Sequence, residues 1–485
     1  MMNSEDQKKT IIRNISWLSI SKIIIYLLSI ITITLVPRYL GVEGYGQLNF
    51  ALSFIGLFAI VCDLGLNTLT LRDVSKNNNL AQKYFSKLFP FKIFLSIVFA
   101  ILMSLIILII DKPLIVKQIL FLTIILLILG VYSSFYLLFF RAKQKLKYAS
   151  IFDVLRKMSY VLFVLIFIYL NKGVIGITFA NIFVAIIGFL FLFFSLFKYL
   201  KFKLEIDFKF IKRQVVRAWP FALGIVFNTL YFHFDKILIS FMLDDYAVGL
   251  YAIGYTFYGF LFSILSVFNL TFFPVIAIYS FKEKLKSVID KYLSIVLLFS
   301  VPLSLGGICL SKELITLIFG QMYVPGLIAF RIILVFFLVA SINSILTVIL
   351  YTHNLEKFVL KYRIIATVTN ILLNLIVIPI FGIVGAAITT VLSEYIILVG
   401  SYLKLSKKII SIDLLKIIKY PLISSIVMLL AIYLFKNIFQ IVIFKNTLNV
   451  LIFVIIGVIF YFISMVLFGG IKKEYLNLVI KSFKK

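Results

Sequence analysis

Ionisable and polar side chains inside long apolar stretches are the first candidates for chemistry in this chain, because a charge is costly inside a membrane. Lys22 lies in the first apolar stretch, and Tyr26 follows it at helical spacing on the same face. Ser19, Ser29 and Thr32 extend this polar stripe along the predicted helix. Such a stripe is typical of a helix face that lines a cavity. The alternative is that Lys22 extends its ammonium group to the cytoplasmic interface.

A second polar stripe lies in a later apolar stretch and consists of Asn228, Tyr231 and Asp235. His233 and Lys236 occupy another face of the same predicted helix. Side chains of sequence neighbours do not face each other on a helix, so Asp235 and Lys236 are each expected to have a partner on another helix. Two interpretations stay open for this group, namely structural ion pairing and the handling of substrate or protons.

Two further charged residues lie in the second half of the chain. Arg331 falls in the outer part of an apolar stretch, where an interfacial anchor and a contact to an anion are both compatible with the sequence. Glu394 falls in the middle of another stretch, and it either pairs with a buried cation or carries a coupling ion such as H+ or Na+. Asp63 and Lys92 lie nearer the cytoplasmic interface and are expected to pair locally or to extend to it.

These positions define the predicted site. Glu394 is the candidate for ion coupling, and the predicted substrate-binding residues are Lys22, Tyr26, Asn228, Tyr231, His233, Asp235, Lys236 and Arg331.

The composition indicates a membrane protein, because 63% of the 485 residues are hydrophobic and only 14% are charged. The formal net charge of +29 would fit a nucleic-acid partner, but the basic residues gather in alternate loops, so no nucleic acid is expected. The two cysteines, Cys62 and Cys309, both lie inside predicted helices, which argues against a disulfide framework and a cysteine metal site. No cofactor and no metal are expected.

The hydrophobic pattern predicts an all-α, polytopic membrane protein with about fourteen transmembrane helices. Lysine and arginine gather at the N-terminus and in the even-numbered connections, so both termini are predicted to be cytoplasmic in a multi-pass protein of the cell membrane. The predicted external connections are too short for a catalytic domain, so an enzyme is not expected. The spans are predicted near residues 14–37, 46–70, 85–110, 113–140, 149–170, 173–197, 215–243, 246–273, 288–310, 326–352, 358–381, 382–404, 412–435 and 445–469.

An internal repeat organises these spans. The pattern around Gly46 returns around Gly249, and a second correspondence aligns Gly173 with Gly382. Internal symmetry of this kind in an apolar chain is typical of transporters, in which the substrate path runs between the repeats. The predicted domains are an N-terminal six-helix lobe (1–197), a basic cytoplasmic linker (198–214), a second six-helix lobe (215–405), and two additional helices with a basic tail (406–485).

Four segments of the chain carry a resemblance to a known family. They are PRYLGVEGYGQLNFALSFIGLFAIVCDLGL, FHFDKILISFMLDDYAVGLYAIGYTF, TLIFGQMYVPG and IPIFGIVGAAITTVLSEY. Over residues 10–405 the chain resembles the polysaccharide-type flippases of the multidrug/oligosaccharidyl-lipid/polysaccharide exporter superfamily. The resemblance implies two six-helix lobes around a central cavity, and it implies transport of undecaprenyl- or dolichyl-linked sugars by alternating access. Asp235 matches a common acidic residue of the family, whereas His233 stands where arginine is frequent.

We therefore predict a flippase that moves a lipid-linked oligosaccharide, on a polyprenyl phosphate or pyrophosphate, from the cytoplasmic to the outer leaflet. Lys22, Lys236 and Arg331 are the cations available for the phosphate group. Besides this substrate, the expected partners are membrane lipids, a coupling ion and glycan-assembly enzymes. The first alternative is a multidrug or cation antiporter of the same superfamily. A membrane glycosyltransferase or polymerase is a second alternative, but it requires a large loop with catalytic residues.

Overall fold

The computed structural model describes residues 4–278, 282–439 and 446–470, and within these ranges every regular element is a helix. The predicted all-α class is therefore confirmed. Contacts divide the chain into two compact units, Met1–Ala252 and Ile253–Lys485, each of which is described by itself. The predicted division into lobes, linker and appendage stays a prediction.

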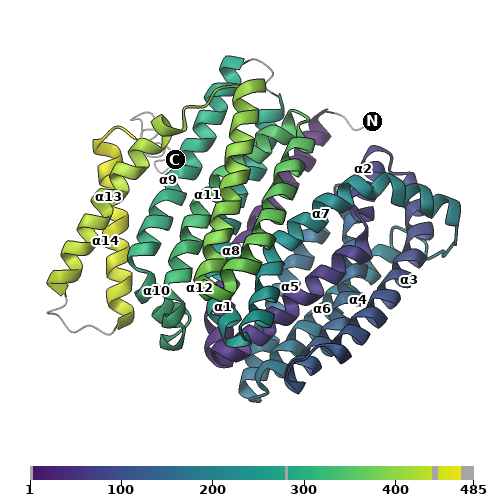
Figure 1. Ribbon diagram of the computed structural model, residues 1–485. Helices are drawn as coiled ribbons and strands as arrows, with labels where there is room; N and C mark the ends of the chain where they lie inside the picture. Colours follow the sequence, from purple (N-terminus) through teal and green to yellow (C-terminus); the bar gives the residue numbers. More distant parts are fainter. Residues whose placement is uncertain (1–3, 279–281, 440–445, 471–485) are drawn as a thin grey trace. The chain divides into compact units, whose positions relative to one another are not determined.

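The first unit is a bundle of long helices, several of which lie side by side (Figure 1). α1 packs along α5 and α7, α5 packs on α6, and α4 packs between α3 and α6. Aromatic rings such as Phe85, Phe135 and Tyr136 fill its buried cluster. Its helices are α1 (Ser4–Asp63), α2 (Leu66–Lys76), α3 (Leu80–Ile109), α4 (Leu114–Ala142), α5 (Leu146–Tyr169), α6 (Gly173–Phe197), α7 (Phe208–Met242) and the first residues of α8 (Asp245–Ile278).

Helix α1 is 60 residues long and has a joint at Gly41, where φ is 69° and ψ is 178°. This backbone conformation favours glycine, because a Cβ would be strained there. About 20 residues suffice to cross a bilayer, so the two arms of α1 correspond to the first two predicted spans. Helix α12 (Glu356–Lys408) in the second unit likewise consists of two helical arms, with its joint at Gly382. In α1 and in α12, therefore, a single glycine connects the two helical arms.

The two halves share backbone details at the aligned glycines. Gly173 at the start of α6 has φ 57°, and its counterpart Gly382 has φ 58°. A positive φ, which favours glycine, therefore occurs at both aligned positions, one in each half of the chain.

A reciprocal contact within the first unit supports the repeat more directly. A Cβ at Gly46 would collide with the backbone carbonyl of Asp245, and a Cβ at Gly249 would collide with that of Val42. Val42 precedes Gly46 by the same number of residues as Asp245 precedes Gly249. Such an exchange of equivalent contacts is what a local two-fold relation produces.

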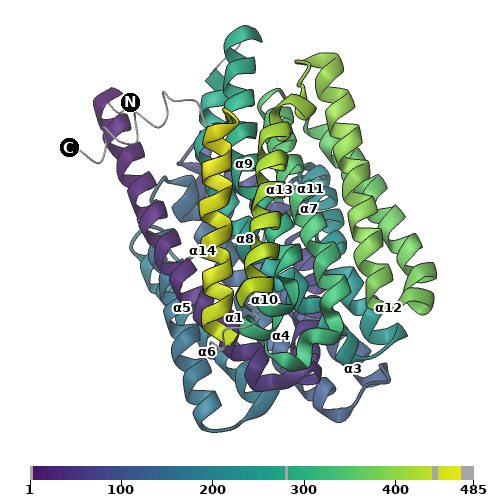
Figure 2. The same ribbon diagram turned by 90° about the vertical axis from the view of Figure 1, so that its left-hand side faces the viewer.

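The second unit contains the remaining helices. α11 packs against α9 and α12, and α13 packs against α9 and α14. Figure 2 shows α13 and α14 side by side. The elements are the rest of α8, α9 (Lys282–Cys309), α10 (Ser311–Ile318), the 3-10 helix η1 (Gln321–Gly326), α11 (Leu327–Thr352), α12, α13 (Leu414–Phe439) and α14 (Asn446–Leu467).

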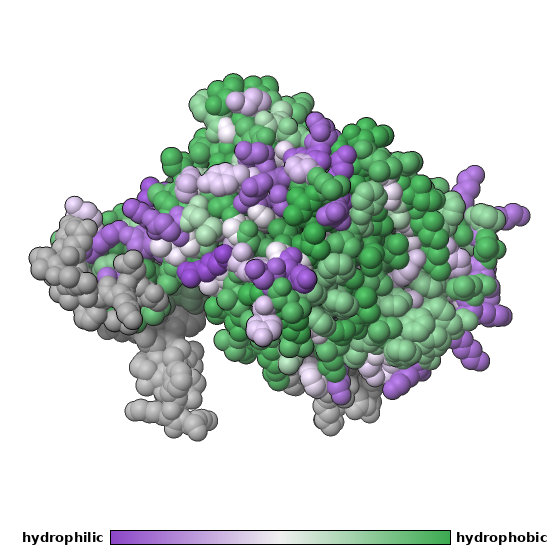
Figure 3. Space-filling model, turned by 90° about the horizontal axis from the view of Figure 1, so that it is seen from below, coloured by the Kyte–Doolittle hydropathy of each residue, from purple (hydrophilic) through white to green (hydrophobic). Residues whose placement is uncertain are grey.

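Eleven helices of the described residues are long and apolar enough to cross a membrane. The segments from α1 and α12 measure 47 and 53 residues, which is long enough for two crossings each. Helix α5 is not among the eleven, and it carries Asp153, Arg156 and Lys157 in its middle. Figure 3, a view from below, shows wide hydrophobic areas with hydrophilic side chains gathered in patches.

Candidate functional site

An open pocket of about 330 Å³, hereafter the cavity, lies within the first unit, and its polar and charged lining side chains come from two helices. Lys22, predicted from the sequence to line a cavity, is one of its lining residues. It comes from the first arm of α1, as does Ile25. The complete lining consists of Lys22, Ile25, Asp153, Arg156, Lys157, Tyr160 and Val184.

Helix α5 supplies most of the polar lining. Asp153, Arg156, Lys157 and Tyr160 follow one another at intervals of three or four residues, so they share one face of the helix. Lys157 reaches across to α1, where its Nζ donates to Thr32 Oγ1 at 2.8 Å. The polar stripe predicted on α1 therefore faces the charged stripe of α5.

The position of Arg156 depends on a ring of its own helix and on close packing with α6. Its guanidinium lies 5.3 Å from the ring centre of Phe152 on α5. Its aliphatic stem runs beside Gly188, where a Cβ would come within 3.2 Å of Arg156 Cγ. The small glycine thus leaves the room that the arginine stem occupies.

The cavity carries an excess of positive charge. Lys22, Arg156 and Lys157 are cationic, and Asp153 is the carboxylate among the lining residues. The charges of Arg141, Lys22 and Arg156 all act on the Asp153 carboxylate. One acid cannot neutralise three cations, so an anionic group that enters the cavity would be attracted electrostatically.

The predicted residues of α7 lie outside the set that lines this cavity. Tyr231 is fully buried, and Asp235 is 1% exposed and accepts a hydrogen bond from Tyr251 at 2.9 Å. His233 packs against the second arm of α1, with its ring 3.6 Å from the Cβ position of Gly56. Asn228 and Lys236 belong to the same helix, and Asn228 is exposed. Tyr26 lies on α1 but is not part of the lining.

The two candidates of the second unit have different surroundings. Arg331 on α11 is exposed, and its Nε donates to Ser311 Oγ at 2.7 Å. Glu394 on α12 is 3% exposed, and its Oε1 accepts a hydrogen bond from Asn343 Nδ2 at 2.7 Å. A buried carboxylate in a membrane-spanning helix is a candidate functional group.

The local pairing expected for Asp63 and Lys92 is confirmed. Lys92 is fully buried, and its Nζ lies 2.8 Å from Asp63 Oδ1. This ion pair joins the end of α1 to α3, which gives it a structural role.

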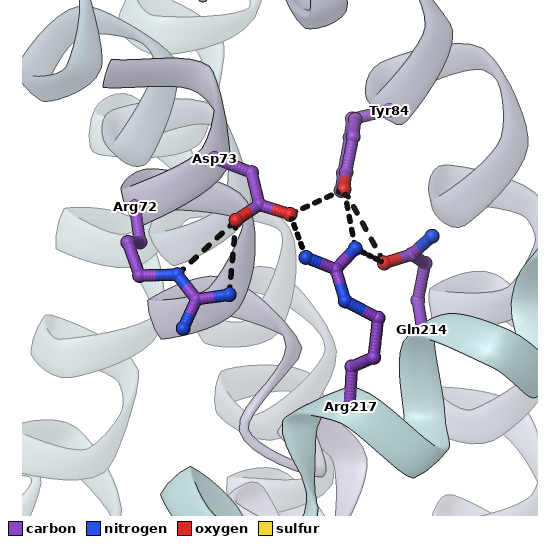
Figure 4. A network of polar contacts seen from close by, with 5 residues as sticks. All are labelled: Arg72, Asp73, Tyr84, Gln214 and Arg217. Carbon is purple, nitrogen blue, oxygen red and sulfur yellow. Dashed lines mark hydrogen bonds and ion pairs between the residues drawn. The ribbon is translucent and has the colours of Figure 1, made fainter. Parts of the chain in front are cut away.

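A polar network outside the cavity ties α2, α3 and α7 together (Figure 4). Asp73 accepts hydrogen bonds from Tyr84 OH at 2.7 Å, Arg217 Nη2 at 2.8 Å and Arg72 Nε at 3.1 Å. Arg217 also donates to Gln214 at 2.8 Å. Burial alone would raise the pKa of Asp73, but the hydrogen bonds from Tyr84 and Arg72 and the charge of Arg217 outweigh it and lower that pKa below 3.8.

The sequence analysis missed Asp153, Arg156, Lys157 and Tyr160. The signal was present, because these residues repeat at helical spacing inside the predicted span 149–170. The described residues contain no group of three or more histidine, cysteine, aspartate or glutamate side chains that could hold a metal ion.

Comparisons with known proteins place the chain in a wider context. Residues 11–280 match the family described as polysaccharide biosynthesis protein. Among solved structures, the chain is similar to the lipid II flippase MurJ in an inward closed conformation, with a TM-score of 0.78 and 16% identity over 93% of this chain and 98% of that chain. A search among curated proteins returned no significant match.

Multidrug transporters share the fold as well. An inward-facing multidrug resistance MATE family transporter of the MOP superfamily gives a TM-score of 0.63 with 15% identity, over 79% of this chain and 94% of that chain. An outward-facing one gives 0.53 with 17% identity, over 82% and 95%. At identities this low, the structural similarity shows a common fold alone.

Proposed function

Because the chain belongs to the polysaccharide biosynthesis protein family, we propose that it is a flippase for a lipid-linked oligosaccharide. It moves an oligosaccharide on a polyprenyl phosphate or pyrophosphate from the cytoplasmic to the outer leaflet of the cell membrane by alternating access. The transported sugar then enters surface polysaccharide or glycan assembly. In this proposal both termini are cytoplasmic.

The observation that carries the proposal is the cationic cavity within a membrane-spanning bundle. Phosphate esters are ionised at neutral pH, and Arg156 can bind two phosphate oxygens at once, whereas lysine binds as a point charge. A cavity of about 330 Å³ falls within the range of small-molecule sites, roughly 300–1,000 Å³. We assign Lys22, Arg156 and Lys157 to the phosphate group, while the polyprenyl tail stays in the bilayer.

The α7 residues and Arg331 keep the substrate role predicted for them as a proposal. Glu394 is proposed to bind the coupling ion, H+ or Na+, because its carboxylate is buried and touches the amide of Asn343. Replacement by glutamine keeps the shape and removes the charge. Glu394→Gln should therefore make transport independent of an imposed ion gradient, and a variant that still responds to the gradient would refute the coupling role.

The central test measures translocation in proteoliposomes. A polyprenyl-diphosphate oligosaccharide carries a label that a membrane-impermeant reagent destroys, and the protected fraction is followed over time. We expect the wild type to exchange the label between leaflets and the Lys22→Gln, Arg156→Gln, Lys157→Gln triple variant to lose this exchange. A matched control removes three exposed cations outside the cavity by Lys76→Gln, Lys198→Gln and Lys201→Gln. Equal exchange by both triple variants would contradict the assignment of the cavity.

Asp153 gives a specific reason to test an antiporter as the second candidate. A carboxylate in a cavity can bind a cationic drug or a proton, and the fold is shared with multidrug transporters. Efflux of a cationic dye against a proton or sodium gradient by the wild type, abolished by Asp153→Asn, would favour this function. Dye efflux without translocation of lipid-linked sugar would replace the flippase proposal.

A further inference from the structure

The connection between α3 and α4 places a buried lysine at the joint between α7 and α8. Lys112 Nζ donates to the carbonyl oxygen of Ser240 at 2.5 Å and to its hydroxyl at 2.8 Å. The same ammonium lies 3.3 Å from Asp245 Oδ1, which also accepts a hydrogen bond from the Ser240 hydroxyl. The side chains of Lys112 and Asp245 are only 9% and 7% exposed.

Two aromatic rings complete the surroundings of this ammonium group. It lies 5.1 Å from the ring centre of Phe50 and 5.4 Å from that of Phe241, and the two rings meet edge to face. Phe50 belongs to the second arm of α1, and Phe241 belongs to α7. A cation over aromatic faces is stabilised by the ring quadrupoles. Lys112 therefore joins the second arm of α1, α7 and α8 through one side chain.

The reciprocal glycine contact lies next to this lysine. The Asp245 residue that binds Lys112 is also the residue whose backbone carbonyl packs on Gly46. Glycines allow the two helices to approach closely, but they provide no side-chain bond that resists separation. Lys112 supplies that directional bond at the same place.

We propose that Lys112, Ser240 and Asp245 form a latch that holds a gate closed at the end of the first unit that the predicted orientation places outside. The proposal rests on the transport function, in which each leaflet must gain access to the cavity in turn. A charged pair suits this task, because both ions regain water when the helices separate, and the water offsets much of the lost attraction. Release of Lys112 is then one step of the transport cycle.

The test measures external access to the cavity in intact cells. A cysteine at Ile25 reports on the cavity in a background in which Cys62 and Cys309 are replaced by serine, and a membrane-impermeant maleimide is applied from outside. Loss of a charge-assisted bond should raise the labelling rate roughly tenfold in Lys112→Ala. Asp245→Asn should act in the same direction, and the double variant should add little to either single change.

The controls separate the latch from general damage. Lys117, in the first turn of α4, serves as the matched control, because its ammonium donates to the Leu108 carbonyl of α3 at 3.2 Å. Lys117→Ala should label like the parent. Lys112→Met retains the aliphatic stem and loses the ammonium group. Its labelling rate tests the latch if the alanine variant does not fold. Parental labelling rates in Lys112→Met and Asp245→Asn would overturn the latch.

Labelling requires no substrate, so the latch and the flippase can fail independently. Faster labelling in the latch variants of a protein that translocates no lipid-linked sugar would retain the gate and reject the function. Translocation by the wild type together with unchanged labelling of the latch variants would retain the flippase function and reject the gate.

Discussion

Two polar regions of the first unit differ in how their charged groups are bonded. In the network of Figure 4, one carboxylate, that of Asp73, is held by two arginines and a tyrosine that bridge α2, α3 and α7. In the cavity, three cations share one carboxylate beside open space. The comparison teaches that a saturated set of bonds connects helices, whereas uncompensated charge around a void is available to a ligand.

The largest effect is expected when a second carboxylate is added to the cavity to neutralise its positive charge. Ile25→Glu places a second carboxylate in the cavity, and Ile25→Gln changes the shape equally without the charge. A carboxylate about 4 Å from a cation contributes roughly 4 kcal/mol at an effective dielectric constant of 20, so we expect translocation to fall at least about a hundredfold with glutamate. Similar rates for the two variants in proteoliposomes would show that net charge does not drive binding.

Removing the carboxylate of Asp153 should instead strengthen the binding of an anionic headgroup. Asp153→Asn leaves the three cations without an acid among the lining residues, so the headgroup should bind about tenfold more tightly and dissociate more slowly. Calorimetric titration with a short-chain polyprenyl diphosphate measures the affinity. Weaker binding would mean that Asp153 orients the cations rather than offsetting them.

The network around Asp73 should affect stability instead of transport. Asp73→Ala leaves Arg72 and Arg217 without their shared carboxylate, but both arginines are more than 40% exposed, so water limits the loss to about 1 kcal/mol. Thermal unfolding in detergent measures this change. Folded protein should translocate within about twofold of the wild-type rate. A large loss of transport at unchanged stability would assign the network a functional role.

The pH dependence of the same network gives the smallest effect. The folded-state pKa of Asp73 lies below its ordinary value of 3.8, so its contribution is complete above that pH and is lost as the pH falls through the lower folded value. The difference in melting temperature between the wild type and Asp73→Asn should therefore stay constant from pH 7 to about 5 and narrow below about 4. A difference in melting temperature that does not narrow at all below pH 4 would mean that the charge of Asp73 is not what matters.

The spans and the repeat can be predicted from the sequence because both depend on local patterns of residue types. Apolar stretches of membrane-spanning length determine the helices, and Gly46 and Gly249 mark a contact that admits no Cβ. Lys22 and Thr32 reveal a polar face by their spacing alone. These features depend on residues near one another in the chain or on the restricted chemistry of glycine.

The partners of these residues depend on packing that spacing does not encode. Lys157 meets Thr32 only because α5 lies along α1, and Lys112 meets Asp245 from a connection more than a hundred residues away. The α7 stripe has the same polar pattern as the α1 stripe, yet Asp235 is bonded to Tyr251. A periodic pattern identifies a polar face but not what that face meets.

The joint at Gly41 has a mechanical consequence. A loop of several residues can absorb the relative movement of the helices that it connects, whereas a single residue between two helical arms has no slack. The first arm carries Lys22 and Thr32, and the second arm packs against α7 through Gly56 and His233. A displacement of the first arm is therefore expected to reach the second arm, and with it α7, only through the φ and ψ angles of Gly41.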